Sequence, residues 1–325
     1  MLVYLIRRVG GALAVMAVMA VIVFLAIYAV GDPIDVLASP EADQAERAAI
    51  AQRLGLDRPL LIQFGTFAAN ALRGDLGRSF VYNVPAVEVI LQRLPATLEL
   101  ALTGLVIAVL LGVPLGLLAG LKPRSLLGRG IMSGSILGFS LPNFWIGLML
   151  ILLFAVELRI LPASGRGETV SVFGVPLAFL TLDGLRHLIL PAVTLALYKT
   201  SLVIRIAESG TRETIGQDFI RFARAKGLSP ARIVGVHVLK AVLIPIVTVL
   251  GLELGSMIAF AVVTETVFAY PGMGKLLIDS INRLDRPIVV AYLMLTVVIF
   301  VTINLVVDLA YAALDPRVRL GEQEG

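Results

Sequence analysis

Hydrophobic residues in this chain are gathered into long runs, and most of the charged residues stand between the runs. Several runs approach or exceed about 20 residues, the length that a helix needs to cross the hydrocarbon core of a bilayer. The pattern therefore predicts an all-α integral membrane protein. Six membrane-spanning helices are expected, at 9–31, 100–121, 131–156, 188–206, 241–264 and 287–307.

Charged side chains are rare inside these predicted spans. Lys199 and Arg205 stand toward the end of the fourth span, where their long side chains can reach the lipid headgroups. The fifth span is interrupted only by Glu253. An even number of spans places both chain termini on the same side of the membrane.

The composition supports this fold class. Hydrophobic residues make up 58% of the chain and charged residues 15%, whereas charged residues are about 25% of ordinary soluble proteins. The chain has no cysteine, which excludes a disulfide framework, an iron–sulfur cluster or a thiol nucleophile. We attribute the net charge of +4 to Lys and Arg in cytoplasmic loops and expect no nucleic-acid partner.

The N-terminus presents Arg7 and Arg8 before its apolar run. A cleaved signal peptide is one interpretation of this arrangement. However, the apolar run 9–31 is longer than a typical signal core, and no clean small-x-small cleavage site follows it. We therefore expect a retained first span.

The charges of the loops predict the orientation. The loop 122–130 has three basic residues and no acid, and the segment 199–240 has eight basic residues against three acids. The other two loops are nearly balanced, because 32–97 has six basic and eight acidic residues and 157–187 has three of each. By the positive-inside rule, the two biased loops and both termini are cytoplasmic.

This orientation gives a predicted organisation of the chain. A tail with the first span occupies 1–31, a small extracytoplasmic subdomain 32–97, a five-span core 98–312 and a cytoplasmic tail 313–325. The core contains the cytoplasmic loop 208–240.

One short helix is expected in the subdomain 32–97. Ser39 is a suitable N-cap for it, and Pro40 suits the first helical position. Gly55 is placed to end this helix in the left-handed conformation.

A basic stretch at 218–245, DFIRFARAKGLSPARIVGVHVLKAVLIP, stands out from the apolar chain. Helical spacing places Phe219, Phe222 and Lys226 along one face. Gly227 is a natural helix stop, and Ser229 is placed to cap a second helix that leads into the fifth span. The stretch is therefore expected to form two short helices that meet at a bend.

Two interpretations of this stretch follow from the residues. It could be a basic loop that obeys the positive-inside rule and touches anionic lipid. Alternatively, the two phenylalanines and the specified bend favour a rigid knob that fits a groove on a partner protein.

Sequence blocks along nearly the whole chain resemble those of a known family. The segment FARAKGL, with Pro245 eighteen residues after Gly227, is similar to the cytoplasmic coupling loop of ATP-binding-cassette importer permeases. The match is with the dipeptide/oligopeptide/nickel permease family, in its first-subunit (permease B-like) branch. Further blocks occur in the family order: RRVG, GDP, LGLDRPLLIQF, LRGDLGRSF, RLPATLELAL, SLPNFWIGLMLILLFA, LPASG, HLILPAVTLAL, ETVFAYPGMGKLL and VDLAYAALDPRVR.

The resemblance implies a type I-like importer permease subunit, which is not an enzyme by itself. Its implied partners are a second homologous permease, two cytoplasmic ATP-binding-cassette subunits, a solute-binding protein and membrane lipid. ATP and Mg²⁺ would be bound by the ATPase subunits, and no cofactor is expected on this chain. Dipeptides or oligopeptides are the implied solutes; nickel chelates, glutathione, opines and sugars are alternatives.

The resemblance also implies that 219–229 contacts an ATPase subunit. In the general importer signature an EAA triplet precedes the glycine, and only its last alanine is matched here. The implied coupling residues are Phe219, Arg221, Phe222, Ala223, Arg224, Ala225, Lys226, Gly227, Leu228 and Ser229.

Polar residues within the spans are candidates for the solute pathway. Glu253 stands alone in its span, where it could line the pathway or form a structural hydrogen bond to a neighbouring helix. Ser140, Asn143 and Asn304 could also line the pathway or join helices, and helix joining is favoured for Asn304. Glu265 is a candidate outer gate or binding-protein contact, with a helix N-cap as the alternative.

Functions of other classes have less support. An ion-driven secondary transporter using Glu253 would be expected to show an inverted repeat and several intramembrane acids, which we do not find in the sequence. The segment PGMGKLL lacks the spacing of a phosphate-binding loop, and we expect it to form a turn before a short helix. No arrangement typical of an intramembrane enzyme or of a zinc site is found.

Overall fold

The computed structural model describes residues 2–26 and 43–314. Five described helices are long and apolar enough to cross a membrane, and a bent pair of helices could form a sixth span. The predicted all-α membrane protein is therefore confirmed, while the side of the membrane on which the termini lie stays a prediction. Two compact units divide the chain, one formed by Met1–Pro95 with Pro271–Gly325 and the other by Ala96–Tyr270.

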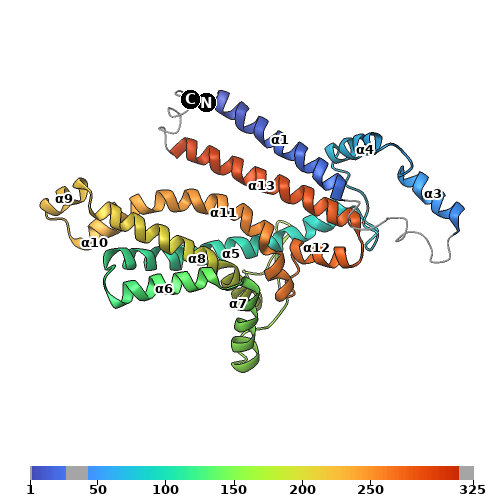
Figure 1. The fold of residues 1–325 in the computed structure, drawn as a ribbon. Helices are drawn as coiled ribbons and strands as arrows, with labels where there is room; N and C mark the ends of the chain where they lie inside the picture. The colour runs from blue at the N-terminus through green and yellow to red at the C-terminus, as the bar shows by residue number, and fades with distance from the viewer. Residues whose placement is uncertain (1, 27–42, 315–325) are drawn as a thin grey trace. The chain divides into compact units, whose positions relative to one another are not determined.

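Three long helices form the centre of the unit Ala96–Tyr270. They are α5 (Ala86–Leu121), which enters this unit at Ala96, α8 (Leu182–Ile215) and α11 (Leu239–Val267). Each is longer than the span predicted there, because polar turns at its ends continue the helix beyond the apolar run. Figure 1 shows α8 and α11 lying side by side.

Close packing joins α5 to α8. A Cβ atom placed on Gly116 would lie 2.4 Å from the Ala207 Cβ and 2.6 Å from the Ile204 carbonyl oxygen. A glycine at this position therefore lets the two helix backbones approach, as small residues commonly do between helices in membranes.

The third predicted span, 131–156, is not one continuous helix. The structure has α6 (Leu126–Ser140), then α7 (Asn143–Leu150) and the π-helical turn η2 (Ile151–Glu157), with a bend of 106° after α6. Pro142 explains the break, because a proline disfavours helical geometry in the preceding residue and cannot donate a backbone hydrogen bond. Leu141 is accordingly extended, with φ −83° and ψ 137°.

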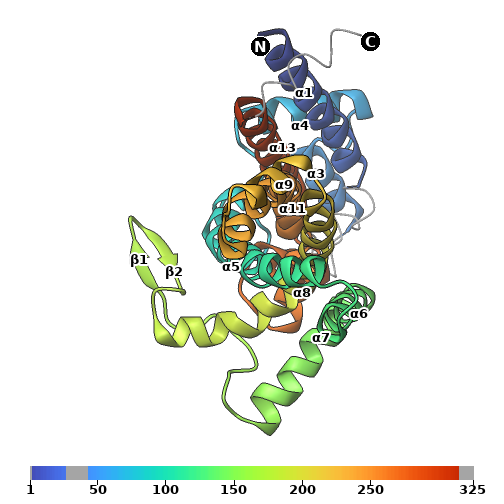
Figure 2. The same ribbon diagram turned by 90° about the vertical axis from the view of Figure 1, so that its left-hand side faces the viewer.

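A β-hairpin occupies the connection between η2 and α8, where the sequence predicted only a loop. Strands β1 (Val170–Val172) and β2 (Val175–Leu177) pair antiparallel, with Val172 opposite Val175. The two-residue turn has positive φ at both Phe173 and Gly174, as a type I′ turn requires. Figure 2 shows the hairpin projecting from the loop that precedes α8.

The second unit contains α1 (Leu2–Ala26), α3 (Gln44–Leu54), α4 (Leu60–Leu72), α12 (Met273–Asn282) and α13 (Arg286–Leu314). Helices α1 and α13 pack side by side (Figure 1). Phe24 of α1 contacts Phe64 and Phe67 of α4, with ring centroids 5.4 and 5.8 Å away. The expected turn before a short helix at PGMGKLL is confirmed by α12.

Buried Asp285, just before α13, fixes the turn that precedes α5. Its carboxylate accepts hydrogen bonds from the Ser79 hydroxyl and from the backbone N–H groups of Phe80 and Val81. The turn and the start of α13 are thereby held together within one unit.

The short helix predicted in 32–97 corresponds to α3. Helix α3 begins at Gln44, and its N-cap Asp43 is extended, so one continuous helix from Pro40 to Gly55 is not present. The Asp43 carboxylate accepts from the Glu46 N–H, while the cap predicted at Ser39 lies outside the described residues. The predicted stop at Gly55 is confirmed by its φ of 68°. Residues 27–42 lie outside the described part, and with them the end of the first span.

Candidate functional site

The basic stretch forms a short helix, α9 (Asp218–Ala225), which is held to the unit by one face. Ile220 is fully buried and Ala223 nearly so. Both belong to a hydrophobic core that includes Val113 of α5, Val203 of α8 and Val242 of α11. The inner face of α9 is therefore anchored in the core that the three central helices share.

An exposed face of α9 carries two large aromatic side chains. Phe219 is 50% exposed and Phe222 is 61% exposed. The Lys226 ammonium lies 4.5 Å from the centroid of the Phe222 ring, so these side chains share one face as the helical spacing predicted. A rigid helix with exposed aromatic groups has the features of a protein-binding knob.

Gly227 and Leu228 end α9 with a tight reversal. Gly227 has φ 77°, its N–H donates to the Arg224 carbonyl at 2.9 Å, and the Leu228 N–H donates to the Ala223 carbonyl at 3.2 Å. These two hydrogen bonds define a Schellman motif, in which glycine is preferred because the backbone is left-handed. The predicted stop is confirmed.

A new helical segment begins immediately after this reversal. The Ser229 hydroxyl accepts from the Arg232 N–H at 3.3 Å, and Pro230 opens α10 (Pro230–Arg232). The π-helical turn η3 (Ile233–Val238) then leads into α11. The predicted cap and bend are confirmed, while the role of this segment in coupling stays a proposal.

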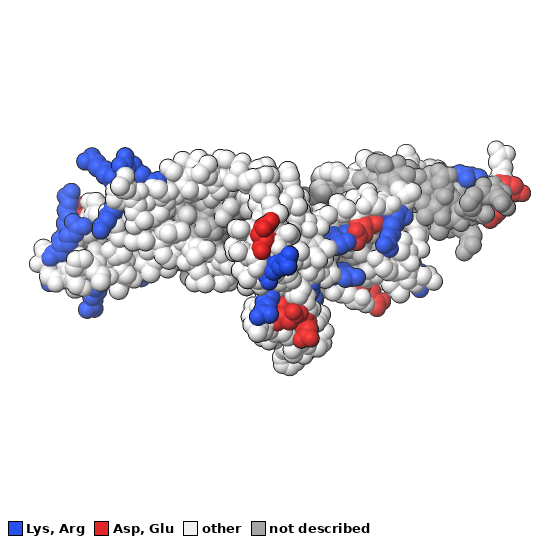
Figure 3. Space-filling model, turned by 90° about the horizontal axis from the view of Figure 1, so that it is seen from below, with Lys and Arg blue, Asp and Glu red and all other residues white. Residues whose placement is uncertain are grey.

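Positive charge surrounds α9. Figure 3 shows Lys and Arg gathered at the end of the unit that carries this helix. Arg221, Arg224 and Lys226 are all exposed, and Arg221 forms an exposed ion pair with Asp218 at 3.2 Å. Exposed pairs of this kind contribute little stability, so the basic side chains remain able to meet acidic groups on a partner.

Glu253, the single charged residue of its predicted span, has partners on α8 and on its own helix, as the predicted structural hydrogen bond to a neighbouring helix implies, while its pathway role stays a prediction. Its carboxylate forms an ion pair with Lys199 of α8 and accepts from the Ser256 hydroxyl at 2.7 Å. The Lys199 ammonium also donates to the Ser256 oxygen at 3.1 Å. Lys199 was expected to reach the headgroups, and this was wrong because a carboxylate on the facing helix offers a nearer partner.

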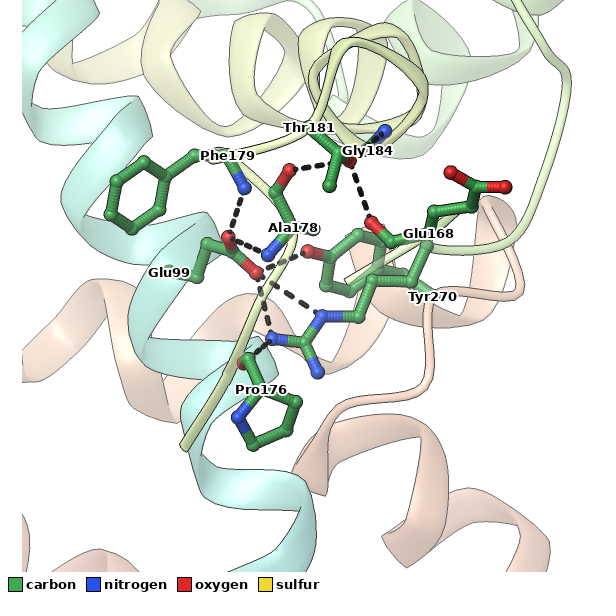
Figure 4. Close-up of polar contacts among 9 residues, drawn as sticks. Glu99, Glu168, Pro176, Ala178, Phe179, Thr181, Gly184 and Tyr270 are labelled. Atoms are coloured by element: carbon green, nitrogen blue, oxygen red, sulfur yellow. Dashed lines mark hydrogen bonds and ion pairs between the residues drawn. The ribbon is translucent and has the colours of Figure 1, made fainter. Parts of the chain in front are cut away.

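Glu99 of α5 organises a second polar cluster that the sequence analysis did not identify (Figure 4). One carboxylate oxygen accepts from the backbone N–H groups of Ala178 and Phe179, each at 2.7 Å. The other accepts from Arg166 Nε and Nη2, at 3.1 and 2.8 Å, and from the Tyr270 hydroxyl at 3.2 Å. Five donors from three segments thus converge on one buried side chain.

This cluster ties the hairpin loop to two long helices. Arg166 also donates to the Pro176 carbonyl at 2.7 Å, and the Gly165 N–H donates to the Phe268 carbonyl at 2.9 Å. Burial, followed by the negative charge of Glu99, raises the pKa of the Tyr270 hydroxyl, so this hydroxyl stays protonated and donates. The arrangement positions a loop, and no substrate chemistry follows from it.

Glu265 lies in the last turn of α11 and is fully buried. Its carboxylate accepts from the Thr97 hydroxyl of α5 at 2.6 Å. The N-cap alternative is therefore wrong, because an N-cap residue precedes a helix. The predicted role in an outer gate or a binding-protein contact stays a prediction.

The other candidate pathway residues belong to helices other than α11. Ser140 ends α6 and its hydroxyl donates to the Ile136 carbonyl at 2.8 Å, while Asn143 begins α7 beyond the bend. Asn304 is in α13, and its side-chain oxygen is buried without a hydrogen-bond partner among the described residues. Pathway and helix-joining roles for all three stay predictions.

Among residues 2–26 and 43–314, no group of three or more His, Asp or Glu side chains is arranged to hold a metal ion. The His187 ring nitrogen Nδ1 lies 2.9 Å from the Asp183 carbonyl oxygen, a local contact within α8.

Comparison with protein families gives two matches that together cover most of the chain. Residues 112–320 match the family described as "Binding-protein-dependent transport system inner membrane component". Residues 1–101 match the N-terminal region of membrane components of the same transport systems.

Curated relatives match over nearly their whole length. The chain is 40% identical to the di/tripeptide transport system permease protein DppB of Pseudomonas aeruginosa (strain UCBPP-PA14), over 89% of this chain and 90% of the relative. It is 34% identical to the dipeptide permease DppB of Escherichia coli (strain K12) and 37% identical to the glutathione permease GsiC of Salmonella choleraesuis (strain SC-B67). Both alignments cover 98% of this chain and 99% of the relative.

A solved structure has the same fold. It is a chain of the methionine ABC transporter MetNI in an inward-facing conformation, with a TM-score of 0.53. The superposition covers 70% of this chain and 96% of that chain, with 17% sequence identity. At this identity the similarity concerns the fold alone.

Proposed function

Because this chain belongs to the family of binding-protein-dependent transport system inner membrane components, we propose that it is one of two permease subunits in an ATP-driven importer of dipeptides or oligopeptides. The chain is a multi-pass protein of the bacterial inner membrane. In the proposed complex it pairs with a second, homologous permease. A solute-binding protein delivers the peptide, and two cytoplasmic ATPase subunits bind ATP and Mg²⁺ and supply the energy.

The names of the relatives support a peptide as the solute. Two of them are named for di- or tripeptide transport and one for glutathione, which is itself a tripeptide. A shared chemical class among relatives with different names favours a solute with peptide bonds and charged termini. Nickel chelates, opines and sugars remain as alternative solutes for the same type of importer.

The single observation that carries the coupling role is the two-sided structure of α9. Its inner face is fixed to the cores of α5, α8 and α11 through Ile220 and Ala223, and its outer face exposes Phe219 and Phe222. An element that couples ATP hydrolysis to transport must be bound by the ATPase and must transmit its movement to the membrane helices. An anchored inner face and exposed aromatic groups on α9 support its assignment to both tasks.

In this proposal the chain has no catalytic group of its own. The sequence lacks a phosphate-binding loop, and ATP hydrolysis is assigned to the two partner subunits. Arg221, Arg224 and Lys226 would guide the approach of an acidic groove on the ATPase, since exposed charges mainly affect the association rate.

The solute pathway is proposed to run beside the polar residues of the spans. Glu253 is the strongest candidate because a carboxylate inside a membrane span is costly and tends to have a function. Ser140, Asn143 and Asn304 are weaker candidates. Glu265 is proposed to belong to the outer gate, where buried hydrogen bonds between α5 and α11 would open and close together.

The test is transport by the reconstituted complex. The permease pair and both ATPases are reconstituted in liposomes. ATP is supplied on the side that carries the ATPases, and the binding protein and labelled dipeptide are added on the other side. Transport of the dipeptide to the ATPase side is then measured. We expect dipeptide uptake and peptide-stimulated hydrolysis, neither of which is competed by a sugar or a nickel chelate. Uptake by this chain alone, abolished by a protonophore and independent of ATP, would contradict the proposal and favour a secondary transporter.

A further inference from the structure

Three side chains form a compact polar site between α8 and α11. The Lys199 ammonium contacts both the Glu253 carboxylate and the Ser256 hydroxyl, and this hydroxyl donates to the carboxylate at 2.7 Å. Ser256 also lies within 2.8 Å of the Glu253 carbonyl oxygen. We refer to Lys199, Glu253 and Ser256 as the mid-span site.

The mid-span site is only partly closed. The Glu253 side chain is 28% exposed and that of Lys199 12% exposed. All hydrogen bonds that described residues make to this carboxylate end on Oε2, and none ends on Oε1. The ammonium also lies 5.0 Å from the centroid of the Tyr198 ring. One carboxylate oxygen therefore remains available to a further donor.

The site lies at the middle of the two helices. Glu253 is the central residue of α11, and Lys199 is one of the two central residues of α8. A charge at the centre of a span costs about 2.5 kcal/mol or more to expose to lipid, and such residues almost always face protein or a water-filled cavity. The open side of the mid-span site therefore faces protein or water in the assembled complex.

We propose that Lys199 and Glu253 line the solute pathway and determine its specificity for zwitterionic peptides, by binding the carboxylate and ammonium ends of the passing peptide. This inference rests on the proposed function as a peptide permease. With no peptide bound, the two side chains neutralise each other. A peptide would exchange partners with them, its ammonium group meeting Glu253 and its carboxylate meeting Lys199.

Paired charges suit this task better than a single charge. A lone buried charge would be strongly destabilising when the pathway is empty, whereas a hydrogen-bonded pair is tolerated. Ser256 can hold either partner during the exchange, because a hydroxyl both donates and accepts. A pathway lined in this way favours solutes that present both charges, because a solute with only one charge would form one charge pair instead of two.

The first experiment measures whether water reaches the site. Because the chain has no cysteine, Ser256→Cys introduces a unique thiol next to the ion pair, and Leu252→Cys, an exposed apolar neighbour on α11, is the matched control. A charged thiosulfonate reagent reacts with thiolate, which forms in water and not in lipid. We expect the reagent to react with Ser256→Cys about tenfold faster than with Leu252→Cys, or more. Peptide-loaded binding protein with ATP should slow the reaction at Ser256→Cys.

The second experiment removes both charges together. The double variant Lys199→Met/Glu253→Gln leaves no unpaired charge, so a purely structural pair would tolerate it with little loss. We expect the complex to assemble while dipeptide uptake at saturating binding protein falls about tenfold or more, because two charge pairs with the solute are lost. The matched control, Lys275→Met/Asp279→Asn, removes an ion pair of α12 outside the spans and should leave uptake unchanged.

The outcomes separate this inference from the proposed function. Equal labelling of Ser256→Cys and Leu252→Cys, or normal uptake by the charge-free double variant, would overturn the inference while the proposed function stands. Failure of the wild-type complex to take up any dipeptide would contradict the proposed function instead. Labelling of Ser256→Cys needs no peptide. It therefore shows whether water reaches the mid-span site even if the complex takes up no dipeptide or the double variant fails to assemble.

Discussion

Glu99 and Arg166 form a buried ion pair, with Arg166 Nη2 2.8 Å from the Glu99 carboxylate, although 67 residues separate them in the chain. The pair holds the loop that carries the hairpin against α5. Backbone donors from Ala178 and Phe179 complete the set, so the carboxylate is well satisfied despite its burial. Such a pair is costly to break from one side, because the other charge stays buried.

The first prediction follows from the cost of leaving one buried charge without its partner. Glu99→Gln should destabilise the protein by about 3 kcal/mol, since Arg166 and two backbone N–H groups lose a charged acceptor. Thermal unfolding in detergent measures the effect. The control is Glu88→Gln, an exposed acid on the same helix, which should change the midpoint little. Equal midpoints for the two variants would show that the ion pair contributes nothing.

The second prediction concerns the close contact between α5 and α8. Gly116→Ala places a methyl group against Ala207 and Ile204 and should cost about 1–3 kcal/mol by overpacking. Gly134→Ala in α6 is the matched control, because nothing lies within 4 Å of its added Cβ. The yield and thermal midpoint of the purified protein should fall for the first variant alone. If Gly134→Ala lowered the yield and the thermal midpoint by the same amount, close packing between α5 and α8 would not explain the effect of Gly116→Ala.

The third prediction tests the orientation in the membrane. Arg224→Cys should be protected from an impermeant thiol reagent in intact spheroplasts, and Asp57→Cys should be labelled, because the charge bias places the loop 208–240 inside and 32–97 outside. Both residues are exposed in the structure, so access differs only by the membrane side. The reverse labelling pattern would invert the topology.

Local features of the fold were predictable from the sequence. The reversal at Gly227 and the cap at Ser229 depend on hydrogen bonds to residues three to five positions away. Such contacts are encoded by a few neighbouring residues, and the sequence therefore predicted them correctly. The start of α3 at Gln44 was not predicted, because Asp43 was interpreted as a residue within the first turns of the helix and not as its cap.

Features that depend on distant residues were not predictable in the same way. Lys199 and Glu253 lie 54 positions apart, and no periodicity in either span indicates that they meet. The bend after Ser140 was missed because the apolar run continues through it without a charge, so that length and hydropathy gave no signal. Pro142 was that signal, since it restricts the residue before it.

The fourth prediction concerns the backbone of Gly227. Nothing lies within 4 Å of an added Cβ there, so only the left-handed conformation penalises a side chain. Gly227→Val should cost about 1–2 kcal/mol of local stability, whereas Gly227→Asn should cost much less because asparagine tolerates this conformation. Co-purification of the ATPase subunits should fall for Val and be nearly retained for Asn. If the Val and Asn variants retained the ATPase subunits equally, the left-handed backbone at Gly227 would not be needed for ATPase attachment.

The last prediction concerns the exposed face of α9. Phe222→Ala should weaken attachment of the ATPase subunits by about 2 kcal/mol or more, since truncation of a central interface aromatic typically has this effect. Arg224→Ala should matter less, because charges at the rim of an interface act mainly on association rate. Phe173→Ala, at the fully exposed turn of the hairpin, is the matched aromatic control and should leave attachment unchanged.

The most direct measurement of the central claim is ATPase co-purification together with peptide-stimulated hydrolysis in the reconstituted complex of Phe222→Ala. We predict that the variant inserts into the membrane normally, loses most of the bound ATPase, and hydrolyses ATP without a response to peptide-loaded binding protein. Wild-type values of both quantities for Phe222→Ala would contradict the account and leave α9 as a basic surface helix without a coupling role.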